Sequence, residues 1–334
     1  MKAYELQARS GFEALTLVER PRRPLKYGEV RVRVHAVSLN FRDLIIARNA
    51  QSRAHPIIPV SDGAGEVLAV GEGVTRLTAG DRVVAAFFPS WQSGSLSDFH
   101  HARALGGGQD GMLAEEVVLP EAAWLKLPDT LSYDAAATLP CAGVTAYHAL
   151  FHAASVKPGE TVLLQGTGGV SIFCLQLARA AGASVIITSS SEDKRARATS
   201  LGAAHTLDYK TEPKWGEAAY LFAGGRGVDV VVDVGGPDTF DQSVAALRYG
   251  GTMSILGVLT GTQGKVNTYA VFHKTLRIAG VYVGSISMFE ELLRALSHNG
   301  IEPVIDRSFS FGEAREAYEY LASGQHFGKV VIKV

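Results

Sequence analysis

The sequence predicts an α/β protein in which a β-rich region is followed by a doubly wound parallel sheet of six strands. Residues 28–39 alternate apolar and polar side chains, which is the period of a half-buried strand. From residue 161 onward, short apolar runs alternate with helical patterns. A glycine cluster at 166–169 separates the first of these apolar runs from the first of these helices.

The first third of the chain is expected to form a compact, β-barrel-like unit. Glycines separate short valine-rich runs at 66–70 and 82–86, which is typical of strands joined by turns. Residues 112–119 have the composition of another strand. A loop rich in Ser, His and Gly is predicted between them, at 89–111.

The middle of the chain has the pattern of a parallel sheet covered on both faces, because continuous apolar strands alternate with helices. The expected strands are 161–165, 184–188, 204–207, 228–234, 252–256 and 277–283, and the expected helices are 170–181, 192–201, 213–223 and 238–248. After residue 285, helices at 289–299 and 312–323 and a strand at 329–334 are expected. A doubly wound sheet needs no further strand, so we expect this tail to return to the first region.

Composition excludes several classes of function. The chain has 334 residues, is 47% hydrophobic and carries a net charge of −1. It has no basic block, so nucleic acid is not expected as a partner. No apolar run approaches the ~20 residues that cross a bilayer, and the N-terminus has no apolar signal core. Its two cysteines, Cys141 and Cys174, exclude a disulfide framework, and we expect a cytoplasmic protein.

The glycine cluster predicts a turn that cradles phosphate. Gly166 permits a tight turn, and Gly168 lets the backbone approach a pyrophosphate. Thr167, Gly169 and Val170 complete the turn, and the helix that follows directs its free N–H groups and positive dipole end toward the anion. Ser171 stands where the third glycine of the usual motif would be. The alternative is a strand-to-helix turn without a ligand.

The second strand of this region indicates which dinucleotide is bound. An NAD site usually has Asp or Glu at the end of that strand, where the carboxylate bonds the ribose hydroxyls. Here the strand ends in three hydroxyl residues with two cations just beyond them: Ser189, Ser190, Ser191, Lys194 and Arg195. Hydroxyls and cations suit a 2′-phosphate, so NADP(H) is the expected cofactor. The alternative is a serine N-cap on a solvated helix with ordinary surface charges.

Several motifs in register resemble those of the medium-chain dehydrogenase/reductase superfamily. They include Gly-Asp-Arg-Val-Val (80–84), Leu-Pro-Cys-Ala-Gly-Val-Thr-Ala-Tyr (139–147), Gly-Thr-Gly-Gly-Val-Ser (166–171) and Phe-Gly-Lys-Val-Val (327–331). The resemblance implies a GroES-like catalytic domain at 1–122 and 285–334, interrupted by a Rossmann domain at 123–284. It also implies an active site in the cleft between the two.

The chain departs from the zinc-binding branch of that superfamily. Its zinc enzymes hold catalytic zinc with an early Cys, a Gly-His-Glu motif and a later Cys. The matching positions here are Asn40, Val60-Ser61-Asp62 and Cys141. Asn and Ser are poor zinc ligands, so we expect no metal, and His100 and His101 are expected to be solvated. The chain looks like the zinc-free quinone-oxidoreductase and enoyl-reductase branch.

The resemblance also implies a set of site residues. Further cofactor contacts are expected at Tyr209, Val234, Gly235, Leu256, Gly257, Val258, Val283, Gly284, Ser285 and Lys329, the last near the pyrophosphate. Without zinc, hydrogen-bond donors must stabilise the developing oxyanion, and the candidates are Asn40, Arg42, Ser61, Cys141 and Thr145. Asp43 and Asp62 could orient donors or relay a proton. Alternatively, Asp43 pairs with Arg42 or Arg82, and Cys141 is a small buried apolar residue.

The sequence thus predicts a zinc-independent, NADPH-dependent reductase of a small quinone or α,β-unsaturated carbonyl. One alternative is an NADP-dependent alcohol dehydrogenase or carbonyl reductase. The other is a non-catalytic NADPH-binding protein, either a sensor or a crystallin-like structural protein. By family analogy we expect a homodimer, in which the apolar segment 276–283 pairs with its copy across a two-fold axis.

Overall fold

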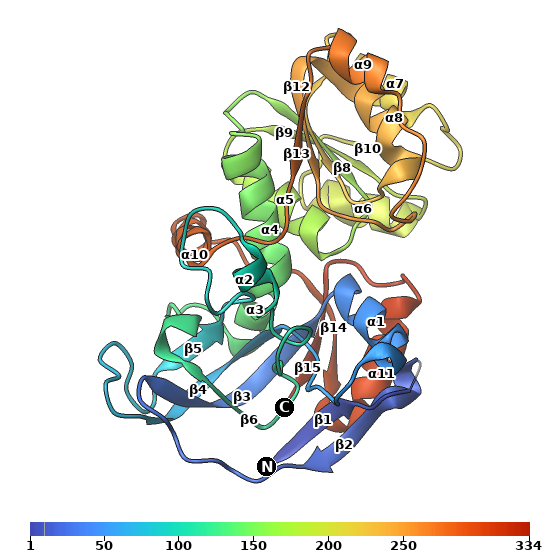
Figure 1. The fold of residues 1–334 in the computed structure, drawn as a ribbon. Coiled ribbons are helices and arrows are strands. Elements are labelled where there is room, and N and C mark those ends of the chain that lie inside the picture. Colours follow the sequence, from blue (N-terminus) through green and yellow to red (C-terminus); the bar gives the residue numbers. More distant parts are fainter. Residues whose placement is uncertain (10) are drawn as a thin grey trace. The chain divides into compact units, whose positions relative to one another are not determined.

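The computed structural model describes residues 1–9 and 11–334, which divide into two compact units (Figure 1). Met1–Val144 and Val283–Val334 form the β-rich unit, and Thr145–Tyr282 forms the parallel-sheet unit. We expected the first boundary after residue 122, but β7 pairs with β5 and α3 contacts β3, so the chain up to Val144 stays in the β-rich unit.

The β-rich unit is built on a sheet in the order β14-β15-β3-β4-β5-β7, with β6 also paired to β3. The long strand β3 accepts β15, β4 and β6 as antiparallel partners, and β1 pairs with β2 in a separate sheet. The strands are β1 (Lys2–Leu6), β2 (Leu15–Glu19), β3 (Glu29–Leu39), β4 (Asp62–Val70), β5 (Arg82–Ala85), β6 (Glu116–Pro120), β7 (Trp124–Lys126), β14 (Ile305–Ser310) and β15 (Lys329–Lys333). The tail therefore does return to the first region of the chain.

Helices cover this sheet and complete its core. α1 and α11 contact each other, and Tyr318 of α11 is buried in one apolar cluster with Val32, Val34 and Leu39 of β3. The helices are α1 (Phe41–Arg48), α2 (Asp98–His101), α3 (Tyr133–Ala137), α10 (Ile286–Asn299) and α11 (Ala314–Ala322). Short 3-10 turns are η1 (Phe12–Ala14), η2 (Ala50–Ser52), η3 (Glu121–Ala123) and η6 (Phe311–Glu313), and η4 (Leu139–Gly143) is a π-helical turn.

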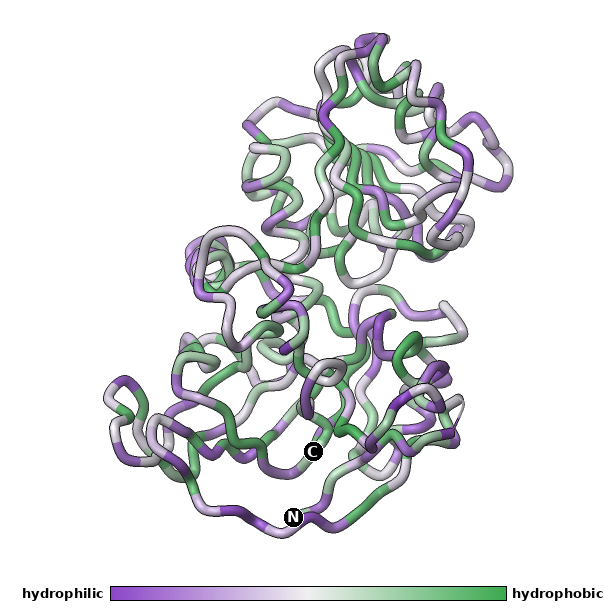
Figure 2. The backbone as a smooth tube through the Cα atoms, viewed as in Figure 1, coloured by the Kyte–Doolittle hydropathy of each residue, from purple (hydrophilic) through white to green (hydrophobic). Residues whose placement is uncertain are grey.

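The parallel-sheet unit contains a sheet in the order β10-β9-β8-β11-β12-β13, with every neighbouring pair parallel. Its strands are β8 (Thr161–Gln165), β9 (Ser184–Thr188), β10 (His205–Leu207), β11 (Val228–Asp233), β12 (Leu247–Ile255) and β13 (Arg277–Gly280). The central strands are hydrophobic along their length (Figure 2), because side chains on both faces are buried. Counted along the chain, the order is that of the doubly wound dinucleotide fold.

The helices of this unit lie between the strands in sequence. α5 and α6 contact β8, β9 and β10, whereas α7 and α8 contact each other and the strands β10, β11 and β12. The bounds are α4 (Val144–Tyr147), which opens the unit, a π-helical turn η5 (His148–Ala153), α5 (Gly169–Ala180), α6 (Glu192–Ser200), α7 (Trp215–Phe222), α8 (Pro237–Ala246) and α9 (Thr268–His273). The predicted combination of a β-rich domain and a six-stranded parallel Rossmann sheet is confirmed by the sheet topology.

Several predicted segments differ in extent. β6 begins at Glu116 rather than residue 112, and the loop predicted at 89–111 contains the short helix α2. β13 ends at Gly280 rather than residue 283, and Val283 has a φ of +54°, which is incompatible with a strand. Among the described residues, no helix combines the length and apolar character needed to span a membrane.

Candidate functional site

The start of α1 presents an amide oxygen to a buried cation. Asn40 is the N-cap, and its backbone N–H donates to Asp43 Oδ2 at 2.8 Å, as in a capping box. An N-cap side chain ordinarily accepts from a first-turn N–H. Here Asn40 Oδ1 also accepts from Lys329 Nζ at 2.6 Å.

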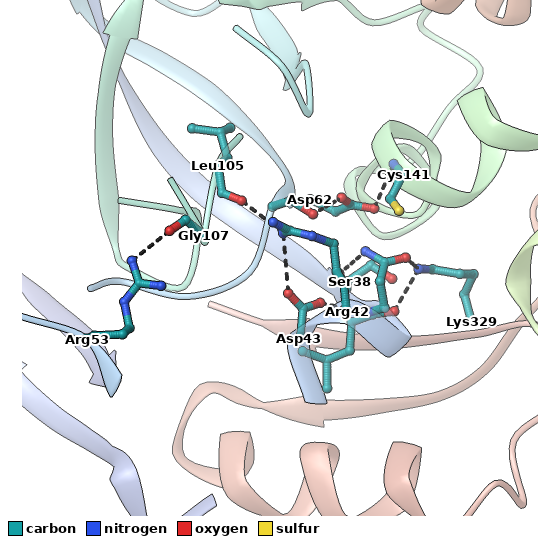
Figure 3. Close-up of polar contacts among 12 residues, drawn as sticks. Ser38, Arg42, Asp43, Arg53, Asp62, Leu105, Gly107, Cys141 and Lys329 are labelled. Carbon is teal, nitrogen blue, oxygen red and sulfur yellow. Dashed lines mark hydrogen bonds and ion pairs between the residues drawn. The ribbon is translucent and has the colours of Figure 1, made fainter. Parts of the chain in front are cut away.

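Lys329 reaches this point from β15 (Figure 3). β15 pairs with β3 so that Val330 lies opposite Leu39, and the Lys329 ammonium also donates to Leu39 O at 2.7 Å. The side chain is buried, with Lys329 only 3% exposed. Gly328 before it has a φ of +79°, and a Cβ there would lie 2.4 Å from Val304 O, so this approach needs glycine.

Ser61 and Asp62 follow a strained residue. Val60 has a φ of +70°, an outlier for a β-branched side chain. Glycines pack on its backbone: a Cβ on Gly106 would lie 2.7 Å from Val60 N, and one on Gly111 would lie 2.1 Å from Val60 O. Such strain is held in place only by close packing and is found at functional sites. Beyond it, Ser61 Oγ donates to Asp62 Oδ1 at 2.6 Å, and both residues are fully buried.

Cys141 closes the other side of Asp62. It lies in the π-helical turn η4, and its backbone N–H donates to Asp62 Oδ2 at 3.0 Å (Figure 3). Single π turns are often found at functional sites. Burial raises the pKa of the Cys141 thiol, and the nearby Asp62 carboxylate raises it further. The thiol is therefore held protonated, and it is the backbone of Cys141 that positions Asp62.

Arg42 is engaged by three neighbouring groups. Its Nη1 donates to Leu105 O at 3.0 Å and lies 3.8 Å from Asp43 Oδ1, and its guanidinium carbon lies 4.5 Å from the centre of the Phe87 ring. A Cβ on Gly107 would lie 2.6 Å from Arg42 Nη2, so the glycine leaves room for the guanidinium. The predicted pairing of Asp43 with Arg42 is therefore present.

Burial shifts the ionisation of the acids and the lysine in this cluster. It raises the pKa of Asp43 to about 6, a shift opposed by the Arg42 charge and the Asn40 N–H. Asp43 Oδ1 has no hydrogen-bond donor within residues 1–9 and 11–334. Burial also raises the pKa of Asp62, with Lys329 as the largest opposing charge. It lowers the pKa of Lys329, and Asp62 is the largest group that opposes this.

The residues at the zinc-ligand positions do not fit a catalytic zinc. Zinc prefers thiolate, imidazole and carboxylate ligands. Asn40 Oδ1 and both Asp62 oxygens accept hydrogen bonds from the protein, and the Ser61 hydroxyl donates to Asp62. In the described part of the chain, no three His, Cys, Asp or Glu side chains are grouped as metal ligands. A buried ammonium at Asn40 would also repel a metal cation.

The glycine turn in the parallel-sheet unit has the features that a pyrophosphate requires. Gly166 has a φ of +68°, and its N–H donates to Thr188 O at 2.9 Å, which holds the turn against β9. A Cβ on Gly168 would meet nothing within 4 Å, so the space in front of it is open. α5 starts directly after it, at Gly169, and its first N–H groups are free for an anion. The residues present therefore fit a dinucleotide phosphate.

Hydroxyl groups meet at the end of β9. Ser190 Oγ lies 3.1 Å from Tyr209 OH, and both groups are on the surface. Ser191 is the N-cap of α6 and accepts from Lys194 N at 3.4 Å, so the capping alternative is correct for this serine. Ser189 is largely buried. The pair Ser190–Tyr209 is thus the exposed part of the serine cluster.

A carboxylate at this edge is already neutralised. Arg195 Nη1 donates to Asp208 Oδ2 at 3.0 Å and to Ser189 O at 2.7 Å. The ion pair removes the repulsion that Asp208 would exert on a phosphate bound beside Tyr209.

A buried polar network at the ends of β8 and β11 was not foreseen from the sequence. Gln165 Nε2 donates to Asp233 Oδ2 at 2.9 Å and to Ser243 Oγ at 2.7 Å. Its Oε1 accepts from Val234 N at 3.2 Å and Gly235 N at 3.1 Å. A polar residue that ends an apolar strand was the available signal, and two such residues occur here.

The turns after β11 and β12 pack directly on each other. A Cβ on Gly257 would lie 2.2 Å from Val234 O, and Leu256 N donates to Asp233 O at 3.0 Å. Gly257 is therefore required by the fold itself, whether or not a ligand binds. Gly235 O accepts from Thr260 Oγ1 at 3.0 Å, and Val258 is exposed beside it. The expected coenzyme contacts of these residues stay predictions.

Four further predicted site residues are divided between the two units: Thr145, Val283, Gly284 and Ser285. Thr145 belongs to the parallel-sheet unit, whereas the other catalytic candidates belong to the β-rich unit. Val283, Gly284 and Ser285 lie in the β-rich unit, where Ser285 Oγ caps α10 by accepting from Met288 N. Lys329, expected near a pyrophosphate, contacts the catalytic candidates of its own unit.

The chain combines a β-rich unit with a parallel sheet in the doubly wound order, and its glycine turn suits a dinucleotide phosphate. These are the features of a nucleotide-dependent dehydrogenase. Comparison with known proteins agrees with this class. Residues 26–129 match the family described as alcohol dehydrogenase GroES-like domain, and residues 169–298 match the family described as zinc-binding dehydrogenase. The chain therefore belongs to the medium-chain dehydrogenase/reductase superfamily and is one of its oxidoreductases.

Individual relatives extend over almost the whole chain. A zinc-type alcohol dehydrogenase-like protein of Schizosaccharomyces pombe is 42% identical over 97% of this chain and 96% of its own. A solved NAD-dependent alcohol dehydrogenase is 34% identical, with a TM-score of 0.91 and full coverage of both chains, 100% each. A mycobacterial protein solved with NADPH is 27% identical, with a TM-score of 0.84, and 100% of each chain is covered. Other curated relatives are named as quinone oxidoreductase-like proteins.

Proposed function

We propose that the protein is a zinc-independent, NADPH-dependent reductase that delivers hydride to a small quinone or α,β-unsaturated carbonyl. The observation that carries this proposal is the hydrogen bonding of Asn40, Ser61 and Asp62, whose side chains are bonded to the protein rather than arranged around a metal. A reductase that lacks a metal suits an acceptor whose carbon is already electrophilic. The polar groups of the protein then need only orient the acceptor and stabilise its oxygen.

The proposed choice of NADPH is supported by the edge at β9 and β10. Ser190 and Tyr209 present two hydroxyls 3.1 Å apart, and Arg195 neutralises the nearby carboxylate of Asp208. Hydroxyls and a cation can bind a 2′-phosphate, whereas NAD sites place a carboxylate at the strand end. Solved relatives include both an NAD-dependent enzyme and an NADPH complex, so this chain's own residues carry the assignment.

When bound, the reduced nicotinamide supplies a hydride. The chain's own contribution is to fix the phosphates on the glycine turn, through the N–H groups that start α5. The Gln165–Asp233 network holds the turn at Val234 and Gly235 in one conformation. Asn40 and Lys329 place polar donors at the start of α1, where the acceptor oxygen would be bound.

NADPH oxidation with three acceptors tests the proposal. An enal, a quinone and a simple ketone are compared at saturating NADPH, with the metal content of the purified protein measured in parallel. We expect turnover of the enal or the quinone without stoichiometric zinc. Turnover of the ketone alone, or activity that depends on zinc, would support the alcohol dehydrogenase alternative, which the names of two relatives favour. Tight NADPH binding without turnover of any acceptor would indicate a non-catalytic protein.

We also propose a homodimer formed through β13. This strand is at the edge of its sheet in the described residues, and Ile278 on it is 37% exposed. An unpaired strand edge with an exposed apolar side chain suits antiparallel pairing with its own copy. Tyr282, 48% exposed just after the strand, extends this apolar surface. Sedimentation that gives the mass of a monomer would contradict the proposal.

A further inference from the structure

Two lysines in this chain bury their ammonium groups in different ways. Lys274 Nζ donates to Val244 O, Ala245 O and Leu247 O at 2.9, 3.0 and 2.7 Å, so all its N–H donors are used on carbonyls at the end of α8. Lys329 Nζ is more deeply buried, yet within residues 1–9 and 11–334 it has only two acceptors, Leu39 O and Asn40 Oδ1. The hydrogen bonds of Lys274 are those of a structural lysine, and those of Lys329 are incomplete.

The remaining N–H of Lys329 is unlike the other donors of its cluster. The Ser61 hydroxyl donates to Asp62, and Arg42 donates to Leu105 O and lies over the Phe87 ring. Asn40 Nδ2 makes a long contact of 3.5 Å to Ser38 O and is uncharged. Arg42 also has N–H donors beyond Nη1, but its charge is paired with Asp43. Lys329 differs because it keeps a charge and a third N–H without a direct carboxylate partner in the described residues.

The surroundings of Lys329 keep that charge available. No carboxylate forms an ion pair with it in the described chain. Burial lowers the pKa of Lys329, and the nearby charges of Asp62 and Asp43 oppose that shift. A direct ion pair would neutralise the ammonium, whereas its two present partners, a backbone carbonyl and an amide oxygen, carry no charge. A buried charge left with an unmade hydrogen bond is costly, and a ligand oxygen would make that bond.

We propose that Lys329 supplies, in place of a metal ion, the positive charge that stabilises the substrate oxygen, through the N–H that neither Leu39 nor Asn40 accepts. Asn40, in the position of the first zinc ligand, then serves to position the ammonium. This inference rests on the proposed reductase function.

Reduction of a conjugated carbonyl transfers one hydride and one proton to the acceptor. A hydride with its electron pair leaves the reduced nicotinamide and forms a C–H bond at the electrophilic carbon. The π electrons of the acceptor move onto the carbonyl oxygen, which becomes negatively charged and accepts the Lys329 hydrogen bond. A proton from solvent then adds to the α-carbon, which restores the C=O bond and gives the saturated carbonyl, while the nicotinamide is left oxidised.

Two substitutions of Lys329 test the charge, and one of Lys274 provides the control. Lys329→Met removes the charge and the donor, Lys329→Gln keeps an uncharged donor, and Lys274→Met removes the structural ammonium. NADPH affinity is measured for each variant by fluorescence, and kcat with the preferred acceptor. We expect kcat to fall about 100-fold or more in Lys329→Met, with a smaller fall in Lys329→Gln, because loss of one oxyanion donor has effects of that size. Lys274→Met should keep the wild-type kcat, and NADPH affinity should change only a few-fold in all three.

A second measurement needs no turnover. p-Nitrophenol carries a single ionisable oxygen, and its visible absorbance reports whether it binds as the phenolate. With NADP⁺ present, we expect the wild-type protein to bind the phenolate form, and Lys329→Met to bind it at least tenfold more weakly. Binding of the neutral phenol alone by the wild-type protein, or no binding, would overturn the proposal.

Two further results would also overturn it. If Lys329 only holds the coenzyme pyrophosphate, both Lys329 variants will lose NADPH affinity while kcat at saturation stays unchanged. Equal phenolate binding by the wild type and Lys329→Met would likewise exclude the role. If no acceptor is reduced but phenolate binding still depends on Lys329, the proposed reductase function fails and the anion-binding role of Lys329 stands.

Discussion

Gln165 and Asp233 are joined by a hydrogen bond of 2.9 Å between Nε2 and Oδ2, at the carboxyl ends of the neighbouring strands β8 and β11. Both side chains are buried, and both also bind the backbone of the turn that follows β11. Ligands of doubly wound folds bind at this end of the sheet. The pair therefore links the strand that leads into the glycine turn to the turn expected beside the nicotinamide ribose.

Replacement of Gln165 by Ala should destabilise the parallel-sheet unit. The change leaves the N–H groups of Val234 and Gly235 without their acceptor and removes a donor from the buried Asp233. Unmade hydrogen bonds of this kind cost about 1–3 kcal/mol each, so we expect the free energy of unfolding to fall by about 2–4 kcal/mol. Urea denaturation measures the loss, and Gln92→Ala, which removes a single 3.4 Å surface bond to Ala122 O, is the control. Equal stabilities of the two variants would show that the network does not hold the turn.

Two glycines of the phosphate turn should respond differently to Ala. Gly168 has a negative φ of −76° and open space around its Cβ position, so Gly168→Ala should leave stability unchanged. The added methyl group would occupy the space where the pyrophosphate is expected, and NADPH affinity should fall at least tenfold. Gly166 has a φ of +68°, so Gly166→Ala should cost about 1 kcal/mol or more of stability. Thermal unfolding and NADPH titration measure both effects, and a Gly168→Ala variant with wild-type NADPH affinity would place the pyrophosphate elsewhere.

Coenzyme preference should depend on Ser190. Its hydroxyl lies 3.1 Å from Tyr209 OH at the surface, and Ser190→Asp would place a carboxylate beside the expected 2′-phosphate. Repulsion of that phosphate, together with new bonds to ribose hydroxyls, should lower the preference for NADPH over NADH by about 100-fold, which corresponds to about 2.7 kcal/mol. The ratio of kcat/KM for the two coenzymes is the measurement. Ser200→Ala is the control, because Ser200 lies at the far end of α6 and the change removes the described bond from its hydroxyl to Ala196 O. A wild-type preference for NADH would contradict the assignment.

Periodicity made the parallel-sheet unit largely predictable. β8 and β9 have the predicted bounds, because continuous apolar runs between helices have few other interpretations. β12 begins at Leu247 rather than residue 252, because its first five residues, 247–251, do not form a continuous apolar run. The placement of β7 and α3 in the β-rich unit was harder to predict from the sequence. It depends on the pairing of β7 with β5, about forty residues earlier in the chain.

The site was only partly predictable. The motifs identified Asn40, Ser61, Asp62 and Cys141 together, and the structure places hydrogen bonds between three of them. The contact of Lys329 with Asn40 joins residues 289 positions apart, and it depends on the register of β15 on β3, which no local pattern encodes. The same is true of the positive φ of Val60, which is set by packing of glycines from a distant loop.

Asp43 gives a pH dependence with a definite sign. Burial raises its pKa to about 6 in the folded protein, above the value of about 3.9 in an unfolded chain. Between these values the folded state binds more protons, so the Asp43 contribution favours folding most below pH 4 and is lost as the pH rises to about 6. About two pKa units correspond to about 3 kcal/mol.

Asp43→Asn removes this titration and keeps an oxygen that can accept from the Asn40 N–H. The stability of the wild type relative to Asp43→Asn should therefore fall by about 3 kcal/mol between pH 4 and pH 7, measured by urea unfolding. Asp193→Asn, which removes an exposed carboxylate, is the matched control. A wild type that gains relative stability as the pH rises would mean that Asp43 is stabilised as the carboxylate.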